Sequence, residues 1–192
     1  MKIEVDVNDG ISGAWRVESF EVSEKEAEFA TMRAMFSFSS RPIQAGKYKR
    51  LMRNHTVVMS NTPCEISDHL SFIYVAKRYG GRILINGLGL GVCLKAILES
   101  DKVGRVTVIE KSQDVINLVG PTFGGDIRVE IINSDAFSYK PPKGIRYSAV
   151  WHDIWDNICA DNLPEMHKLH RKYGRRCDWQ GSWARELCER HR

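Results

Sequence analysis

The feature that most constrains this fold is a regular alternation of strand-like and helix-like segments from residue 82 onward. Four apolar runs cover residues 82–88, 105–110, 127–135 and 147–155, and segments with helical spacing separate them. Strands that are apolar along their whole length are typical of parallel sheets, which helices cover on both faces. The alternation therefore predicts an α/β fold with a parallel sheet and right-handed crossovers.

The first part of the chain follows another pattern and predicts a small N-terminal β/α extension over residues 1–60, ahead of a Rossmann-like domain over residues 61–192. Residues 2–7 and 13–22 alternate apolar and polar side chains, as half-buried strands do. Residues 39–50 have the composition of a loop or linker.

Two helices are expected before residue 82. Ser23 and Glu26 have the spacing of a capping box, which is typical of a helix start. Thr62, followed directly by a proline, predicts an N-cap for the second helix, and Gly80 follows its last residue. A short strand over residues 55–60 is expected between them.

Composition places the chain among ordinary folded proteins of the cytoplasm. It has no run of about 20 apolar residues, as a membrane span needs, and no signal-peptide-like segment at its start. The five cysteines are odd in number and lack C-x-x-C spacing, which favours reduced thiols. We therefore expect a cytoplasmic protein that does not associate with membranes.

A glycine-rich stretch, Asn86-Gly87-Leu88-Gly89-Leu90-Gly91, comes directly after the first strand of the alternating part. Nucleotide-like ligands bind at such a place, where a strand ends and a helix begins. The stretch has neither the G-x-G-x-x-G spacing of dinucleotide folds nor the G-K-[ST] ending of a P-loop. A tight turn that only lets the helix pack on the strand is the alternative interpretation.

The spacing Gly87-x-Gly89-x-Gly91 resembles motif I of the class I S-adenosyl-L-methionine (SAM)-dependent methyltransferases. The resemblance implies SAM as the cofactor, with the three glycines letting the backbone approach its methionine part. In that family an acidic residue usually precedes the first glycine. Asn86 stands there in this chain and is the candidate for the contact to the methionine end.

The next two strands end in carboxylates. Glu110 follows Gly87 by 23 residues, the place from which a carboxylate binds both ribose hydroxyls in dinucleotide folds. Asp135, followed by Ala136, matches the methyltransferase position that the resemblance assigns to the adenine amino group. A surface glutamate and an N-cap aspartate are the alternatives without a ligand.

The fourth strand carries a second resemblance. Tyr147, Asp153 and Asp156 match the Tyr-Asp-x-Ile-x-x-Asp-x-x-Asp pattern of the spermidine synthase family, although Ser148 replaces its first aspartate and Leu90 replaces an aspartate of its glycine loop. The resemblance implies that Asp153 helps to deprotonate an attacking amine and that Asp156 helps to hold it. An N-cap aspartate followed by a solvated one is the alternative.

These motifs together predict a SAM-dependent transferase, methyltransferase-like, acting on a small amine or another small nucleophile. An aminopropyltransferase of the spermidine synthase type is one alternative, and a non-catalytic SAM-binding or interaction module is another. No metal site is expected, because His167 and His170 lack the spacing of a known zinc motif.

The C-terminal region predicts two helices and a loop with no fifth strand, so the sheet is expected to be shortened at this edge. An open edge invites pairing, which favours a homodimer. Between Lys168 and Arg192 the chain has eight Lys/Arg and three Asp/Glu. This basic tail could bind nucleic acid, but a solvated basic face with buried aromatic anchors is the preferred interpretation.

Overall fold

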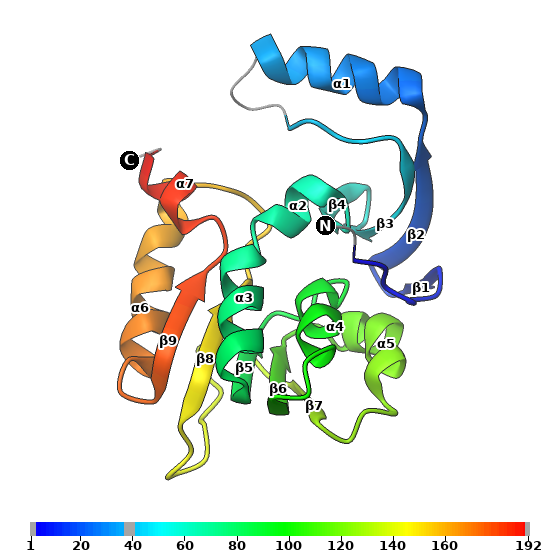
Figure 1. Cartoon of the computed structure of the whole chain (residues 1–192). Coiled ribbons are helices and arrows are strands. Elements are labelled where there is room, and N and C mark those ends of the chain that lie inside the picture. Colours follow the sequence, from blue (N-terminus) through cyan, green and yellow to red (C-terminus); the bar gives the residue numbers. More distant parts are fainter. Residues whose placement is uncertain (1–2, 37–40, 191–192) are drawn as a thin grey trace.

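The computed structural model describes residues 3–36 and 41–190, and within them the chain forms two sheets (Figure 1). The first is antiparallel with the order β1-β2-β3-β4, and the second has the order β7-β6-β5-β8-β9 with every pair parallel. The antiparallel strands are β1 (Gly10–Ser12), β2 (Trp15–Val22), β3 (Gly46–Arg53) and β4 (Thr56–Ser60). The parallel strands are β5 (Gly81–Asn86), β6 (Val103–Glu110), β7 (Val129–Asn133), β8 (Tyr147–His152) and β9 (Cys177–Ser182).

Helices cover both faces of the parallel sheet, and the prediction of an α/β fold with a parallel sheet is confirmed (Figure 1). The helices are α1 (Glu24–Phe36), α2 (Pro63–Ser67), α3 (Leu70–Tyr79), α4 (Val92–Leu98), α5 (Gln113–Val119), α6 (Leu163–Tyr173) and α7 (Arg185–Arg190). Alternate residues of β5 divide between two core clusters: Ile83 and Ile85 pack with α3 and α4, and Leu84 packs with α6. The strands are apolar throughout because both faces are buried.

The expectation that no fifth strand follows β8 is wrong. β9 pairs in parallel with β8 from Tyr147↔Cys177 to His152↔Ser182. Its sequence, CDWQGS, has no β-branched residue, and Trp179 is its one strand-favouring side chain, so local propensity is too weak to predict a strand. The ring of Trp179 stacks on Trp151, with 6.3 Å between ring centroids, and this packing with the β8 ladder stabilises the strand. The two expected helices are present as α6 and α7, and among the described residues the sheet ends at β9.

The N-terminal predictions need two corrections. Residues 3–9 belong to no strand of either sheet, although Ile3, Val5 and Val7 are buried as their alternation predicts. Of the expected linker 39–50, residues 39 and 40 lie outside the described residues, and β3 begins at residue 46. Tyr48 and Leu51 are buried on opposite faces of this strand, and each shares its face with lysine or arginine side chains, so the sequence shows no apolar alternation.

The helix-start signals have different outcomes. The capping box forms as predicted: the Ser23 backbone N–H donates to Glu26 Oε2 over 2.8 Å, and the Glu26 N–H donates to Ser23 Oγ over 3.3 Å. Thr62 lies at the N-cap of α2 but makes no side-chain cap bond. The single helix expected here is broken into α2 and α3 at Asp68, and Gly80 ends α3 at a φ of 62°.

The antiparallel sheet packs against the parallel sheet and the helices around it. One core cluster contains Val17 and Leu51 of the first sheet together with Val92 of α4 and Val115 of α5. Ser12 Oγ donates to Asp114 Oδ1 over 2.7 Å at the same contact. The antiparallel sheet is therefore fixed over the loops that follow the parallel strands. No helix in the described part of the chain has the length and apolarity needed to cross a bilayer.

Because this core is shared, we predict that Leu51→Ala lowers the free energy of unfolding of the whole chain by about 2–5 kcal/mol, the cost of a cavity at a buried leucine. Leu51 is 1% exposed, whereas Leu70 is 42% exposed, so Leu70→Ala is the matched control with an expected loss under about 1 kcal/mol. Urea unfolding followed by circular dichroism and tryptophan fluorescence measures both. A transition in Leu51→Ala that equals the wild-type one would contradict the shared core.

Candidate functional site

A cavity of about 720 Å³ lies between the carboxyl ends of the parallel strands and the antiparallel sheet. The loops after β5, β6, β7 and β8 supply Gly87, Glu110, Asp135 and Asp153 to its wall. Trp15, Arg53 and Met59 from the antiparallel sheet and Trp155 and Trp183 from the C-terminal half complete much of the lining. The volume is within the range of pockets that hold a small ligand or cofactor.

Contacts within the protein, as well as access for a ligand, explain why this loop carries glycines. Gly87 has a φ of 96°, and a Cβ there would lie 1.8 Å from the carbonyl oxygen of Asp153. A Cβ on Gly89 would lie 2.2 Å from Met59 Sδ, and one on Gly91 would lie 2.4 Å from the ring of Phe123. Gly87 and Gly89 line the cavity, whereas Gly91 does not and packs against α5 and the turn after it. Close packing thus explains Gly91, and both packing and cavity access explain Gly87.

Glu110 lies at the end of β6 with its carboxylate inside the cavity wall. Its Oε2 accepts from the Leu88 backbone N–H and its Oε1 from the Ser112 N–H, both over 2.8 Å. The carboxylate thereby joins the glycine loop to the start of α5. Each carboxylate oxygen has a second acceptor site, so a ribose contact stays a prediction that this geometry permits.

Asp135 and Ala136 also line the cavity, at the end of β7. Asp135 Oδ1 accepts from the Phe137 backbone N–H over 2.7 Å, and Oδ2 lies 3.1 Å from Lys111 Nζ. Burial raises the pKa of this carboxyl, but the backbone bond from Phe137 and the contact with Lys111 outweigh it, so the pKa is lowered overall. Asp135 is therefore an ionised acceptor at neutral pH.

Asn86 is turned away from the cavity. Its side chain is fully buried, and Nδ2 lies 2.8 Å from His152 Nδ1. Burial, with a smaller effect of the neighbouring His170, lowers the pKa of His152 to about 3, so this imidazole is neutral and accepts the amide proton. Only the backbone of Asn86 reaches toward the site, where its carbonyl accepts from the Asp153 N–H over 2.8 Å. A contact between Asn86 and a ligand stays a prediction.

Asp153 is the group in the cavity whose acidity is most altered. Its burial and then the negative charges of Glu65, Asp68, Glu110 and Asp156 raise its pKa to about 7. A carboxylate with this pKa can take up and release a proton near neutral pH, as a general base must.

His69 faces Asp153, with its Nε2 atom 3.9 Å from Asp153 Oδ2. Burial lowers the pKa of His69 to about 4, so the ring is neutral. Its Nδ1 atom is buried without a hydrogen-bond partner among the described residues. His69 also makes an edge contact with Trp151. The break between α2 and α3 places this ring in the wall of the cavity.

Two arginines from the N-terminal part of the chain bind the surrounding carboxylates. Arg53 of β3 forms an ion pair with Asp156, so this predicted substrate-holding residue is occupied by a protein cation. Arg41 Nη1 lies 2.6 Å from Asp68 Oδ2, which also accepts from Trp183 Nε1 over 3.3 Å. These pairs place two positive charges beside the cavity.

The structure thus brings Gly87, Gly89, Glu110, Asp135, Ala136, Asp153 and Asp156 to one cavity and leaves Asn86 and Gly91 outside its wall. His69, Arg41, Arg53 and Met59 also line the cavity, and no sequence motif predicts them as site residues. These four come from segments that no motif marks, and only long-range packing brings them to the strand ends. The position of His69 just before an apolar helix, in a segment that leads into the glycine motif, is the one local sign that could have suggested it.

No protein-family model and no curated protein matches this sequence. Solved structures resemble it in part. The 23S rRNA methyltransferase ErmE matches at 18% identity and a TM-score of 0.37, over 45% of this chain and 35% of its own. The plantazolicin methyltransferase BpumL in complex with SAH matches at 16% identity and a TM-score of 0.45, over 60% of this chain and 45% of its own. The CcbJ methyltransferase from Streptomyces caelestis matches at 16% identity and a TM-score of 0.46, over 60% of this chain and 46% of its own. The matched region spans less than half the length of each of these three proteins.

Because the Gly87 Cβ would overlap a backbone oxygen at a positive φ, we predict that Gly87→Ala lowers stability by about 3 kcal/mol, from strain and overpacking together. For a chain of this size the unfolding midpoint should fall by roughly 10 °C in a thermal scan. Gly125→Ala is the control, because a Cβ there meets no atom within 4 Å. Equal midpoints for the two variants would show that the loop does not depend on this contact.

Proposed function

We propose that this protein is a SAM-dependent transferase that moves a methyl group to a small amine or another small nucleophile. The observation that carries the proposal is the convergence of four strand ends on one cavity. A glycine loop, two carboxylates suited to a ligand and a proton acceptor meet there.

The residues present fit SAM. Gly87 offers backbone without a side chain at the cavity wall, while Glu110 and Asp135 offer carboxylate acceptors at the ends of the next two strands. This order along the sheet, from glycine loop to Glu110 to Asp135, suits the methionine part, the ribose and the adenine in turn. Met59 lies against Gly89, and its Sδ accepts from the Leu90 N–H over 3.1 Å, so this N–H of the loop is already bonded within the protein.

The chemistry assigned to this chain is orientation and proton removal. When bound, SAM supplies a methyl group attached to a positively charged sulfur. This sulfur becomes a neutral thioether when the methyl group is transferred. An amine acceptor is mostly protonated at neutral pH, and Glu65 and Asp153 line this end of the cavity beside the Arg53–Asp156 ion pair, so carboxylates are available to a cation there. The ionised Asp153 carboxylate then takes the N–H proton and leaves the nitrogen lone pair free to attack.

An aminopropyltransferase is the second candidate, and the number of carboxylates around Asp153 favours it. The negative charges of four neighbouring carboxylates act on the Asp153 carboxyl, namely Glu65, Asp68, Glu110 and Asp156. A cluster of several carboxylates suits a substrate with more than one positive charge. Against this candidate, Leu90 is completely buried in the core at the loop position where the synthases carry an aspartate.

We predict that S-adenosylhomocysteine binds the full chain with a dissociation constant on the order of 10 µM. Glu110→Ala should weaken it at least tenfold, because a hydrogen bond to a charged group contributes about 1.5–3 kcal/mol. Isothermal titration calorimetry measures this, and Glu130→Ala is the control, since Glu130 lies on β7 and pairs with Arg105.

Decarboxylated SAM, methylthioadenosine and NAD complete the titration. Tighter binding of decarboxylated SAM or methylthioadenosine would favour the aminopropyltransferase. A preference for NAD, or no binding by any of the four compounds, would refute the cofactor assignment.

For turnover, we predict that Asp153→Asn lowers the rate with an amine acceptor by about 10²–10⁴-fold and leaves the affinity for S-adenosylhomocysteine within about twofold. The folded-state pKa of Asp153 is raised to about 7, so the active, ionised form is lost as pH falls below 7. The wild-type rate should therefore rise from pH 6 to pH 8. Formation of S-adenosylhomocysteine from SAM with a panel of mono- and diamines measures both effects, with Asp161→Asn as an exposed control.

An unchanged rate in Asp153→Asn would exclude Asp153 as the base. Cofactor binding without turnover on any acceptor of the panel would favour the non-catalytic SAM-binding module.

A further inference from the structure

α1 has its large apolar side chains on the outside. None of its residues is buried, and Phe29 is 59% exposed, Met32 57% and Phe36 87%. The side chains that are half-buried are the small ones, Ala27, Ala30 and Ala34. This helix therefore turns its weakest apolar face to the protein and its strongest one to solvent, the reverse of an ordinary surface helix.

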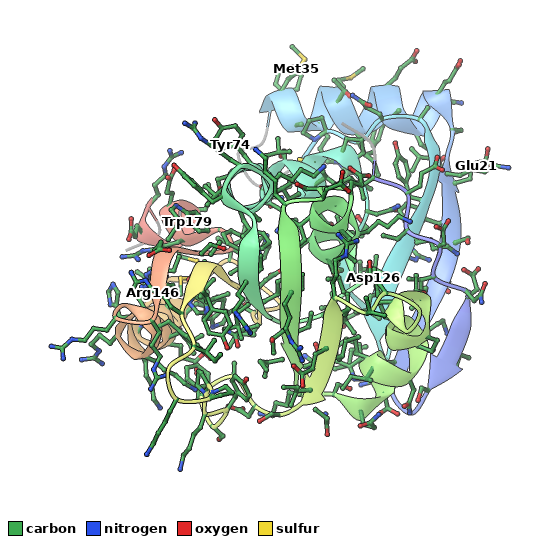
Figure 2. All side chains as sticks on the ribbon, turned by 60° about the horizontal axis from the view of Figure 1, so that its bottom comes forward. Glu21, Met35, Tyr74, Asp126, Arg146 and Trp179 are labelled. Atoms are coloured by element: carbon green, nitrogen blue, oxygen red, sulfur yellow. The ribbon has the colours of Figure 1, made fainter. Side chains whose placement is uncertain are left out.

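The position of α1 in the fold leaves that face open. Figure 1 shows α1 at the outer end of the antiparallel sheet, away from the parallel sheet and its helices. Figure 2 shows Met35, which is 79% exposed, pointing away from the body of the molecule. A helix of 13 residues is marginal in water on its own. Burial of the outer face against another surface would stabilise it, and contiguous exposed apolar side chains are typical of interaction sites.

The outer face has the spacing of a helix–helix seam. Lys25, Phe29, Met32 and Phe36 follow one another at intervals of four, three and four residues, which places them in one row along the helix. The Arg33 guanidinium lies 5.2 Å from the centre of the Phe29 ring, beside this row. A second helix can therefore pack along the row over the length of α1, about 20 Å at 1.5 Å per residue.

The charges of α1 favour another copy of itself. Its first half carries Glu24, Glu26 and Glu28 against one lysine, and its second half carries Arg33 without an acidic residue. Within the described residues, neither Glu28 nor Arg33 has an ion-pair partner. In an antiparallel pair the acidic half of each helix lies beside the half of its partner that carries Arg33, and the two helix dipoles are opposed, which is favourable.

We propose that the row Lys25, Phe29, Met32 and Phe36 of α1 is a self-association surface on which a second copy of this chain docks through its own α1, antiparallel about a two-fold axis. Such an interface is isologous, so the same residues serve on both copies. Phe29 of one copy meets Met32 of the other near the axis. The contact is smaller than a standard interface, so the dissociation constant is expected in the micromolar range. This surface is separate from the open β9 edge and from the cavity.

Charge-reversed pairs of the full chain test the proposal. Arg33→Glu makes α1 strongly acidic, and the double variant E24K/E28K makes it strongly basic while keeping the Glu26 capping box. Analytical ultracentrifugation from about 1 to 300 µM should show a dimer for the wild type and monomers for each variant alone. An equimolar mixture of the two variants should recover a dimer, with a dissociation constant within about tenfold of the wild-type value.

Two controls separate this surface from general stickiness or charge. Ile127→Ser removes an apolar side chain that is 98% exposed outside α1, and Asp101→Lys reverses an exposed charge outside α1; both should associate as the wild type does. Circular dichroism checks that every variant is folded. A wild type that stays monomeric at the highest concentration, variants that dimerise unchanged, or a mixture that stays monomeric would each overturn the proposal. A wild type that stays monomeric and binds phosphatidylcholine–phosphatidylglycerol vesicles through Met32 would also overturn the proposal. A lipid surface, and not a second copy of the chain, would then dock on this row of α1.

Discussion

Gly87 and Asp153 approach each other backbone to backbone at the carboxyl edge of the parallel sheet, with no room for a side chain on Gly87. The contact follows from the pairing of β5 with β8, in which Asn86 lies opposite His152 and the Asp153 N–H donates to the Asn86 carbonyl. It fixes the Asp153 carboxylate beside the glycine loop. A proton acceptor and a cofactor-sized cavity therefore share one wall.

The antiparallel sheet supplies the other wall, and its role is electrostatic as well as steric. Arg53 pairs with Asp156 and Met59 covers Gly89, so both the acidic cluster and the glycine loop depend on residues from the first third of the chain. Without such cations, several carboxylates in a half-buried cavity would repel one another and the folded state would be less stable. The pairing of Asp156 with Arg53 leaves Asp153 as the carboxylate with the raised pKa of about 7.

Neutral histidines complete this arrangement. Burial lowers the pKa of His69 to about 4 and that of His152 to about 3. Both rings are therefore uncharged when Asp153 ionises, and neither supplies a positive charge that would lower the pKa of Asp153. The two histidines instead pack against Trp151 and Asn86.

The features that arise from neighbouring residues can be predicted from the amino-acid sequence. These are the strand–helix alternation, the capping box at Ser23, the glycines that need a positive φ, and the carboxylates Glu110, Asp135 and Asp153 at strand ends. Parallel topology alone then brings strand ends to one edge, so the sequence sufficed for much of the candidate site. Three features follow instead from long-range contacts in the folded chain: CDWQGS forms β9, the helix after Thr62 breaks at Asp68, and His69, Arg41 and Arg53 reach the cavity. Each of these depends on packing or charge pairing between segments far apart in the chain, whose energy no local pattern contains.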